Sequence, residues 1–133
     1  MPSLTADVIL YTDRKVLLIK RLREPFKNKW AIPGGFVDFE ETIVYAAARE
    51  LKEETSIEIA PDELVLFKLA DKKGRDPRGW TVTAVYSCKV LKPIKATACD
   101  DAAKAEWFDL DDLPEMAFDH NEILNDFRAH LSI

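Results

Sequence analysis

The stretch from Gly35 to Ile57 reads Gly-Phe-Val-Asp-Phe-Glu-Glu-Thr-Ile-Val-Tyr-Ala-Ala-Ala-Arg-Glu-Leu-Lys-Glu-Glu-Thr-Ser-Ile. It places three carboxylates, those of Glu50, Glu53 and Glu54, on one turn of a predicted helix. Residues three and four apart share a helix face, and each like-charged pair costs about 0.2–0.5 kcal/mol in an isolated helix. A hard divalent cation among the carboxylates explains this spacing, because Mg²⁺ prefers oxygen ligands and is usually completed by waters and substrate phosphates.

A Pro-Gly-Gly loop precedes this helix, which we expect to run from about Glu40 to Thr55. Apolar residues recur with helical spacing and form the predicted buried stripe, which comprises Ile43, Val44, Ala47, Ala48 and Leu51. The glutamates are offset from that stripe. The glycines of the loop allow the backbone to approach a phosphate or a metal ion closely.

The stretch resembles the signature of the Nudix hydrolases, which is Gly, five residues, Glu, seven residues, and then Arg-Glu-apolar-x-Glu-Glu-x-Gly-apolar. The matching positions are Gly35, Glu41, Arg49, Glu50, Leu51, Glu53, Glu54 and Ile57. Ser56 stands where the family has glycine, and a positive φ there costs serine about 1 kcal/mol, so we expect a loosened or reshaped turn. A solvated helix face would also account for the glutamates, but not for the preceding loop or the spacing to Glu41.

The resemblance implies an α/β fold, namely a Nudix-type α/β/α sandwich with a mixed β-sheet. It also implies hydrolysis of the diphosphate linkage of a nucleoside diphosphate derivative, with Mg²⁺ as the cofactor and Mn²⁺ as a substitute. By position, Glu50 and Glu54 match the principal metal ligands of the family, and Glu53 supplements them. Gly35 matches the position that offers a backbone carbonyl to a metal ion.

The resemblance further implies catalytic roles. Arg49 orients the helix carboxylates and Glu41 supports the helix, although a surface ion pair worth under about 1 kcal/mol is the alternative for Arg49. The general base is left open, since some family members use a helix glutamate, here Glu53, and others an acidic residue on a later loop. Asp100 and Asp101 are the loop candidates, and a solvated turn is their alternative because aspartate favours turns.

Residues 75–83 and 117–120 are similar to the ADP-ribose pyrophosphatase branch of the family. We expect Arg75 and Arg78 to contact phosphate or a ribose edge and Trp80 to stack on adenine. A solvated loop is the alternative for the arginines, and sheet packing is the alternative for the tryptophan. The expected reaction, in nucleotide metabolism, is therefore hydrolysis of ADP-ribose to AMP and ribose 5-phosphate.

Apolar and alternating runs outside the signature predict the remaining elements. The strands are expected over residues 4–11 and 15–20 as a hairpin, and over 30–32, 64–70, 80–90 and 103–108. Asp119 is expected to cap a C-terminal helix, and His120 is interpreted as a helix-start residue rather than a catalyst. Cys88 lies on the same side of its strand as Trp80 and Tyr86, so we expect its thiol to be buried.

The length of 133 residues predicts a single domain. The resemblance implies that this domain, over residues 1–133, is a Nudix hydrolase domain. The formal net charge of −5 and the pI near 5.1 argue against nucleic acid or an acidic membrane as the main partner. No secretory signal or membrane-spanning run is evident, so we expect a cytoplasmic protein with reduced cysteines. The expected partner is a small-molecule nucleotide substrate. A homodimer is left open, since members of the resembled family are often dimers.

Two other functions are alternatives. A nucleoside triphosphate pyrophosphohydrolase acting on an oxidised dGTP would need hydrogen bonds to the base edge, and no asparagine or glutamine stands out as a base reader. A non-catalytic sensor of ADP-ribose is the second alternative. Such regulators carry an added DNA-binding domain, and the segment after Phe108 is too short for a winged helix. A sensor would also be free to lose the helix glutamates, which are all present.

Overall fold

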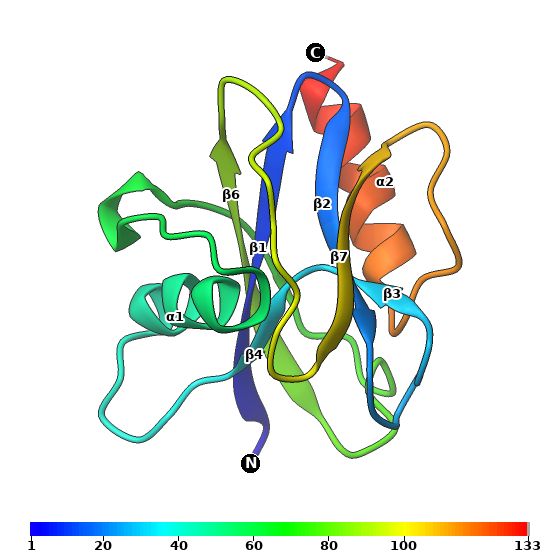
Figure 1. Cartoon of the computed structure of the whole chain (residues 1–133). Helices are drawn as coiled ribbons and strands as arrows, with labels where there is room; N and C mark the ends of the chain where they lie inside the picture. The colour runs from blue at the N-terminus through cyan, green and yellow to red at the C-terminus, as the bar shows by residue number, and fades with distance from the viewer. Residues whose placement is uncertain (133) are drawn as a thin grey trace.

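A seven-stranded mixed sheet forms the middle layer of the computed structural model, which describes residues 1–132 (Figure 1). Its strands are β1 (Ser3–Thr12), β2 (Lys15–Arg21), β3 (Trp30–Ala31), β4 (Gly34–Phe36), β5 (Val65–Ala70), β6 (Thr81–Lys89) and β7 (Ala102–Asp109). The main order is β3-β2-β1-β6-β5, with β4 paired to β1 and β7 paired to β2. β1 and β6 are parallel and the other pairs are antiparallel, so the predicted mixed sheet is confirmed.

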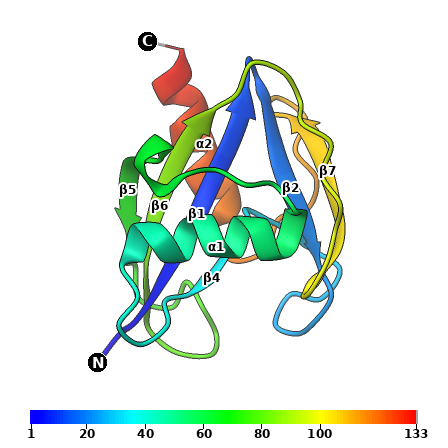
Figure 2. The same ribbon diagram turned by 60° about the vertical axis from the view of Figure 1, so that its left-hand side comes forward.

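Two helices cover opposite faces of this sheet, α1 (Ile43–Thr55) and α2 (His120–Leu131) (Figures 1 and 2). Side chains alternate along β1, so that Val8 packs in the core under α1 while Ile9 packs in the core under α2. A strand covered on both faces is apolar almost throughout, which is the pattern of β1. The predicted α/β/α sandwich is therefore confirmed.

β1 and β2 pair beside their connecting turn and then separate. The register that joins them comprises two pairs, Tyr11 with Val16 and Thr12 with Lys15. Farther along, β4 lies next to β1 and β3 lies next to β2, while β7 pairs with the opposite edge of β2. Figure 2 shows the two strands diverging from the turn. The sheet is therefore split between β1 and β2.

The signature helix begins at Ile43 rather than at Glu40. Thr42 is the N-cap, and its hydroxyl accepts a hydrogen bond from the Tyr45 N–H at 3.3 Å, which satisfies one of the free amides at the helix start. Glu40 has a φ of 64°, a left-handed conformation that a right-handed helix cannot contain. The predicted end at Thr55 is confirmed.

The strands predicted from the sequence are confirmed to within one residue at either end. The short strand β4, which contains the glycine pair, is an addition to that prediction. Cys88 is buried, as expected. Among residues 1–132, no helix is both long and apolar enough to cross a membrane.

Ser56 ends α1 in the left-handed conformation, with a φ of 66°. Its N–H donates to the Lys52 carbonyl at 2.9 Å, and its hydroxyl donates to the Thr97 carbonyl at 3.2 Å. The turn therefore keeps the shape that glycine would adopt, and the expectation of a loosened or reshaped turn is wrong. The hydroxyl, which glycine lacks, ties this turn to the segment before β7.

Ser56→Gly and Ser56→Ala should separate these two effects. Both variants lose the hydroxyl hydrogen bond, worth about 0.5–1.5 kcal/mol, but only glycine relieves the positive φ. Ser56→Gly should therefore be more stable than Ser56→Ala by about 1 kcal/mol, measured by urea unfolding. Metal dependence should persist in both proteins. An alanine variant as stable as the glycine variant would show that the left-handed turn is not strained.

Candidate active site

A pocket lies where β1 and β2 separate, and several elements line it together. β1 contributes Asp7, α1 contributes Glu50 and Glu54, and β4 contributes Gly34 and Gly35. Further lining comes from β2, from the loop before β6 and from the start of α2. Residues that are far apart in the sequence therefore meet at one site.

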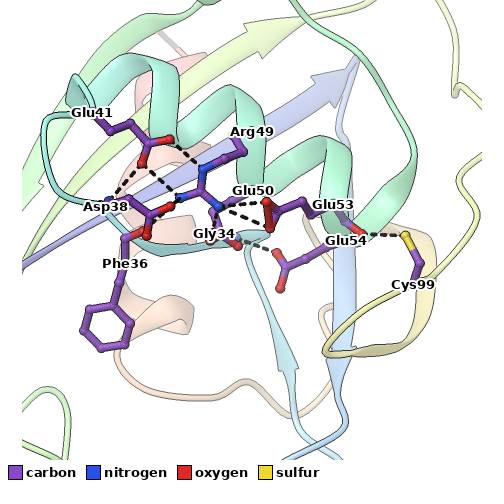
Figure 3. A network of polar contacts seen from close by, with 9 residues as sticks. All are labelled: Gly34, Phe36, Asp38, Glu41, Arg49, Glu50, Glu53, Glu54 and Cys99. Atoms are coloured by element: carbon purple, nitrogen blue, oxygen red, sulfur yellow. Dashed lines mark hydrogen bonds and ion pairs between the residues drawn. The ribbon is translucent and has the colours of Figure 1, made fainter.

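The two adjacent glycines bring the backbone of β4 against the carboxylates. A Cβ on Gly35 would lie 2.5 Å from the carboxyl carbon of Glu50, and a Cβ on Gly34 would lie 1.9 Å from Oδ1 of Asp7. Both distances are far shorter than van der Waals contact, so a larger residue would have to displace a carboxylate. The Gly34 N–H also donates to Oε1 of Glu54 at 2.8 Å (Figure 3).

Glu50 and Glu54 belong to the same face of α1 and are both desolvated. Burial raises the pKa of Glu54 well above its usual range. Burial also raises the pKa of Glu50, against the opposing effect of Arg49. A bound cation favours the charged form of a carboxyl group and lowers its pKa. The two carboxylates are therefore placed where a cation would stabilise both.

Arg49 connects the helix carboxylates through its guanidinium group (Figure 3). Its Nε and Nη2 donate to the two carboxylate oxygens of Glu41, at 2.6 and 3.0 Å. Its Nη1 donates to Oε1 of Glu50 and to Oε1 of Glu53, at 2.9 Å each. An arginine with three carboxylate partners is more constrained than a single surface ion pair. Its orienting role in catalysis stays a prediction.

The predicted site residues fall on two sides of α1. The pocket brings together Gly35, Glu50, Glu54 and Asp101. Glu53 and Asp100 instead line a second groove, formed by α1, the 3₁₀-helix Pro61–Glu63 and the segment before β7. Asp101 is exposed, and its Oδ1 lies 3.2 Å from Nε of Arg23. Of the two loop aspartates, only Asp101 borders the pocket.

Arg75 is buried, so the solvated-loop alternative is wrong for this residue. Its Nε and Nη2 donate to the two carboxylate oxygens of Asp119, at 2.9 and 2.8 Å. Its Nη1 donates to the hydroxyls of Thr81 and Thr83, at 2.8 and 2.6 Å. Asp119 is the N-cap residue of α2, as predicted, but its carboxylate pairs with Arg75 and makes no cap bond to the helix. Arg75 borders the pocket, and its contact with substrate stays a prediction.

Arg78 borders the pocket, whereas Trp80 is not among its lining residues. Asp76 accepts hydrogen bonds from Nε and Nη2 of Arg78, at 3.1 and 2.8 Å. The indole N–H of Trp80 donates to the Asp71 carbonyl at 3.0 Å, and Nζ of Lys73 lies 4.9 Å from the centroid of an indole ring that is half exposed. The stacking of Trp80 on adenine stays a prediction.

The sequence interpretation missed a buried pair, Asp7 and His120. Nδ1 of His120 accepts a hydrogen bond from the Ile32 N–H at 3.0 Å, which assigns the proton of the neutral ring to Nε2. That Nε2 lies 3.4 Å from Oδ2 of Asp7. Burial raises the pKa of Asp7 to about 8 and lowers the pKa of His120 to about 3. The available signal was a lone aspartate inside an apolar strand. His120 does start α2, as predicted.

Asp7→Asn should flatten the pH dependence of the melting temperature of the metal-free protein. The pKa of Asp7 rises from 3.8 to about 8 on folding, so its contribution to stability is present below pH 3.8 and is lost as pH rises towards 8. His120 has the opposite sign, but only below its unfolded pKa of 6.5. Above pH 6.5, His120 no longer contributes to the change in stability with pH, so melting in EDTA reports on the acidic groups. The melting temperature of the wild-type protein should fall more steeply with pH there than that of Asp7→Asn. If the melting temperatures of the two proteins fall in parallel with pH, Asp7 is not protonated in the folded protein.

The donor set fits a hard divalent cation. Glu50 and Glu54 supply carboxylate oxygens, and the missing Cβ of Gly35 lets its backbone lie against the carboxyl group of Glu50. Within residues 1–132, no three or more histidine, cysteine, aspartate or glutamate side chains are arranged as a ready-made metal site. Mg²⁺ is usually bound by one or two carboxylates and completed by waters and substrate phosphates, so two carboxylates suit it.

Comparison with known proteins decides the family of the chain. A family model described as the NUDIX domain matches residues 1–127. The chain belongs to the Nudix family. An ADP-ribose pyrophosphatase from Methanocaldococcus jannaschii is 43% identical over 126 residues, which cover 95% of this chain and 73% of that protein. The resemblance seen in residues 35–57 is therefore confirmed, and the chain is a Nudix pyrophosphohydrolase.

Two further proteins similar to this Nudix chain are longer than it is. The ADPR responsive transcriptional repressor NtrR from Acinetobacter baylyi is 33% identical over 139 residues, covering 98% of this chain and 55% of that protein. A bifunctional NMN adenylyltransferase/ADP ribose pyrophosphatase from Francisella tularensis, solved with AMP and a Mn ion, has a TM-score of 0.88 at 29% identity. That match covers 98% of this chain and 42% of the enzyme. Nudix hydrolases generally use divalent metal ions and act on nucleotides.

Proposed function

We propose that this Nudix hydrolase cleaves the diphosphate linkage of ADP-ribose to AMP and ribose 5-phosphate, with Mg²⁺ as its cofactor and Mn²⁺ as a substitute. The observation that carries the proposal is the meeting of Glu50, Glu54 and the Gly35 backbone in one pocket. The identity of 43% to an ADP-ribose pyrophosphatase supports the choice of substrate. We further propose a single domain over residues 1–133, a cytoplasmic location and a small-molecule partner.

In this proposal Glu50 and Glu54 hold the metal ion, and Glu53 would supplement them only after its side chain leaves Arg49 and the groove on the other side of α1. A bound metal ion would neutralise the diphosphate charge and lower the pKa of bound water. Arg49 keeps Glu50 ordered through a hydrogen bond of 2.9 Å while the substrate enters. Asp76 holds Arg78 beside the pocket, where its positive charge attracts the anionic substrate as a whole.

The general base must accept a proton from the attacking water while the bond to the departing phosphate breaks. Asp101 borders the pocket and is exposed, so its side chain can turn towards that water. Glu53 and Asp100 lie in the groove on the other side of α1. We therefore propose Asp101 as the first candidate and keep Glu53 as the alternative.

A substrate panel tests the proposed function. ADP-ribose, NADH, nucleotide sugars and an oxidised dGTP are assayed with Mg²⁺, with Mn²⁺ and with EDTA. We expect the highest kcat/KM for ADP-ribose, with AMP and ribose 5-phosphate as products and no turnover in EDTA. Faster hydrolysis of the oxidised dGTP would favour a nucleoside triphosphate pyrophosphohydrolase. Binding of ADP-ribose without hydrolysis would favour a sensor, the alternative that the similarity to the A. baylyi repressor supports.

A further inference from the structure

Four side chains of the pocket are more than the diphosphate chemistry requires. We call these four residues the aromatic mouth. They all line the pocket and are Phe36, Phe118, Arg21 and Arg78. The guanidinium carbon of Arg78 lies 5.1 Å from the ring centroid of Phe36 and 5.7 Å from that of Phe118. The guanidinium carbon of Arg21 lies 5.0 Å from the Phe118 centroid. All three distances are within the range of a cation–π contact.

Phe36 leaves much of its ring open to a ligand. Phe36 lies in β4, borders the pocket and is 43% exposed. Figure 3 shows the ring pointing away from α1, while the Phe36 carbonyl accepts a hydrogen bond from Arg49. The backbone at this position is therefore tied to the helix carboxylates, and the ring is free to contact a bound molecule.

Phe118 is held in an uncommon conformation. Its φ is 52°, a left-handed value that costs a bulky residue free energy and that clusters at ligand-binding sites. The neighbouring Asp119 receives both hydrogen bonds of the Arg75 fork, and the Phe26 ring packs 4.8 Å from the Phe118 ring. The Arg75–Asp119 pair therefore acts as a brace that keeps the Phe118 ring beside the pocket.

Arg78 is also fixed in orientation. Asp76 is buried and accepts hydrogen bonds from Nε and Nη2 of Arg78, which uses two donors that a phosphate would otherwise take. The guanidinium group of Arg78 lies over the Phe36 ring and near the Phe118 ring. Flat π-systems stack on aromatic rings and on arginine planes. The mouth therefore presents two aromatic rings and two guanidinium groups to a planar ligand in one place.

We propose that the aromatic mouth binds the nucleobase of the substrate by stacking, in place of the half-exposed Trp80. This inference rests on the proposed function only in taking a nucleotide as the ligand. The base lies between or against the rings of Phe36 and Phe118. The diphosphate then extends to Glu50 and Glu54, which line the same pocket.

Calorimetric binding of AMP and of ribose 5-phosphate tests the proposal, because one ligand carries a base and the other does not. Wild type is compared with Phe36→Ala, Phe118→Ala and Trp80→Ala in buffer with Mg²⁺. Phe39→Ala is the matched control, since Phe39 is 93% exposed and lies outside this pocket. In the two mouth variants the Kd of AMP should rise about 5- to 150-fold, the range for loss of one aromatic stack. The Kd of ribose 5-phosphate should stay unchanged.

Unchanged AMP binding in both mouth variants overturns the proposal, and so does equal weakening of both ligands. A loss of AMP binding in Trp80→Ala alone assigns the base to Trp80 instead. Phe118 packs on Phe26, so melting curves accompany every variant, and the exposed Phe36 carries the test if Phe118→Ala unfolds. AMP binding needs no turnover. Selective loss of AMP binding in a protein that does not hydrolyse ADP-ribose would therefore retain the base site and reject the proposed function.

Discussion

Replacing Glu54 with glutamine is expected to lower kcat/KM for diphosphate hydrolysis by at least about 10²-fold, or about 2.7 kcal/mol of transition-state stabilisation. Glutamine keeps the shape of the side chain and one oxygen that can accept the hydrogen bond from the Gly34 N–H, now at 2.8 Å. It removes the anionic charge that a divalent cation requires. The variant should also need more Mg²⁺ for half-maximal activity, which a metal titration of the hydrolysis rate measures.

Folding of Glu54→Gln should be intact or improved. Glu54 is buried, and burial raises its pKa well above the usual range, so a neutral amide avoids the cost of desolvating a charge. Glu63→Gln is the matched control, because Glu63 is an exposed glutamate of the 3₁₀-helix and should retain wild-type activity. A Glu54→Gln protein that hydrolyses ADP-ribose at the wild-type rate would remove Glu54 from the proposed metal ligands.

Arg75→Met is expected to reduce the free energy of unfolding by about 3–5 kcal/mol, the usual cost of removing one partner from a buried ion pair. The change leaves the Asp119 carboxylate without its two hydrogen bonds from the guanidinium group. It also removes the donor to the hydroxyls of Thr81 and Thr83. Arg14→Met is the matched control. Arg14 makes the same fork to Asp111, at 3.0 and 2.8 Å, but both side chains are exposed, so its loss should cost under about 1 kcal/mol.

Urea unfolding of the two variants, together with ADP-ribose kinetics, separates the two roles of Arg75. The double variant Arg75→Met/Asp119→Asn should lose less stability than the sum of the single variants, since both remove the same interaction. An unchanged unfolding free energy with a raised KM would instead identify Arg75 as the substrate contact that its loop composition suggests.

Local spacing accounts for what the sequence could predict of the site. Glu50 and Glu54 share a helix face because they are four residues apart, and Arg49 reaches Glu53 for the same reason. The apolar stripe and the alternating runs located the helices and strands to within a few residues. The missed N-cap at Thr42 reflects the φ of Glu40, a backbone conformation that side-chain periodicity does not report.

The sequence predicted less about the loop residues, because a charged run with glycine and proline is typical of a loop exposed to solvent. Arg75 stands in a run of charged residues with glycine and proline, yet it is buried against Asp119. Asp119 has the residue type of a helix cap, but a cap bond is weaker than a buried two-point ion pair with arginine. Which of two partners a carboxylate takes depends on a residue 44 positions away, and no local pattern contains that information.

By itself, the sequence determined the carboxylate face of α1, because that face follows from spacing within one short segment. The family and the α/β/α layers followed from the resemblance of residues 35–57 to a known signature. Only the tertiary structure decided which residues meet at the pocket. β1 and β2 pair for two residues and then separate, and this split brings Asp7, His120, Phe36 and Phe118 beside the helix glutamates. The split depends on the competing pairs of β4 with β1 and of β3 with β2. These are long-range contacts, whose free energy is set by the whole sheet rather than by any one stretch of the chain.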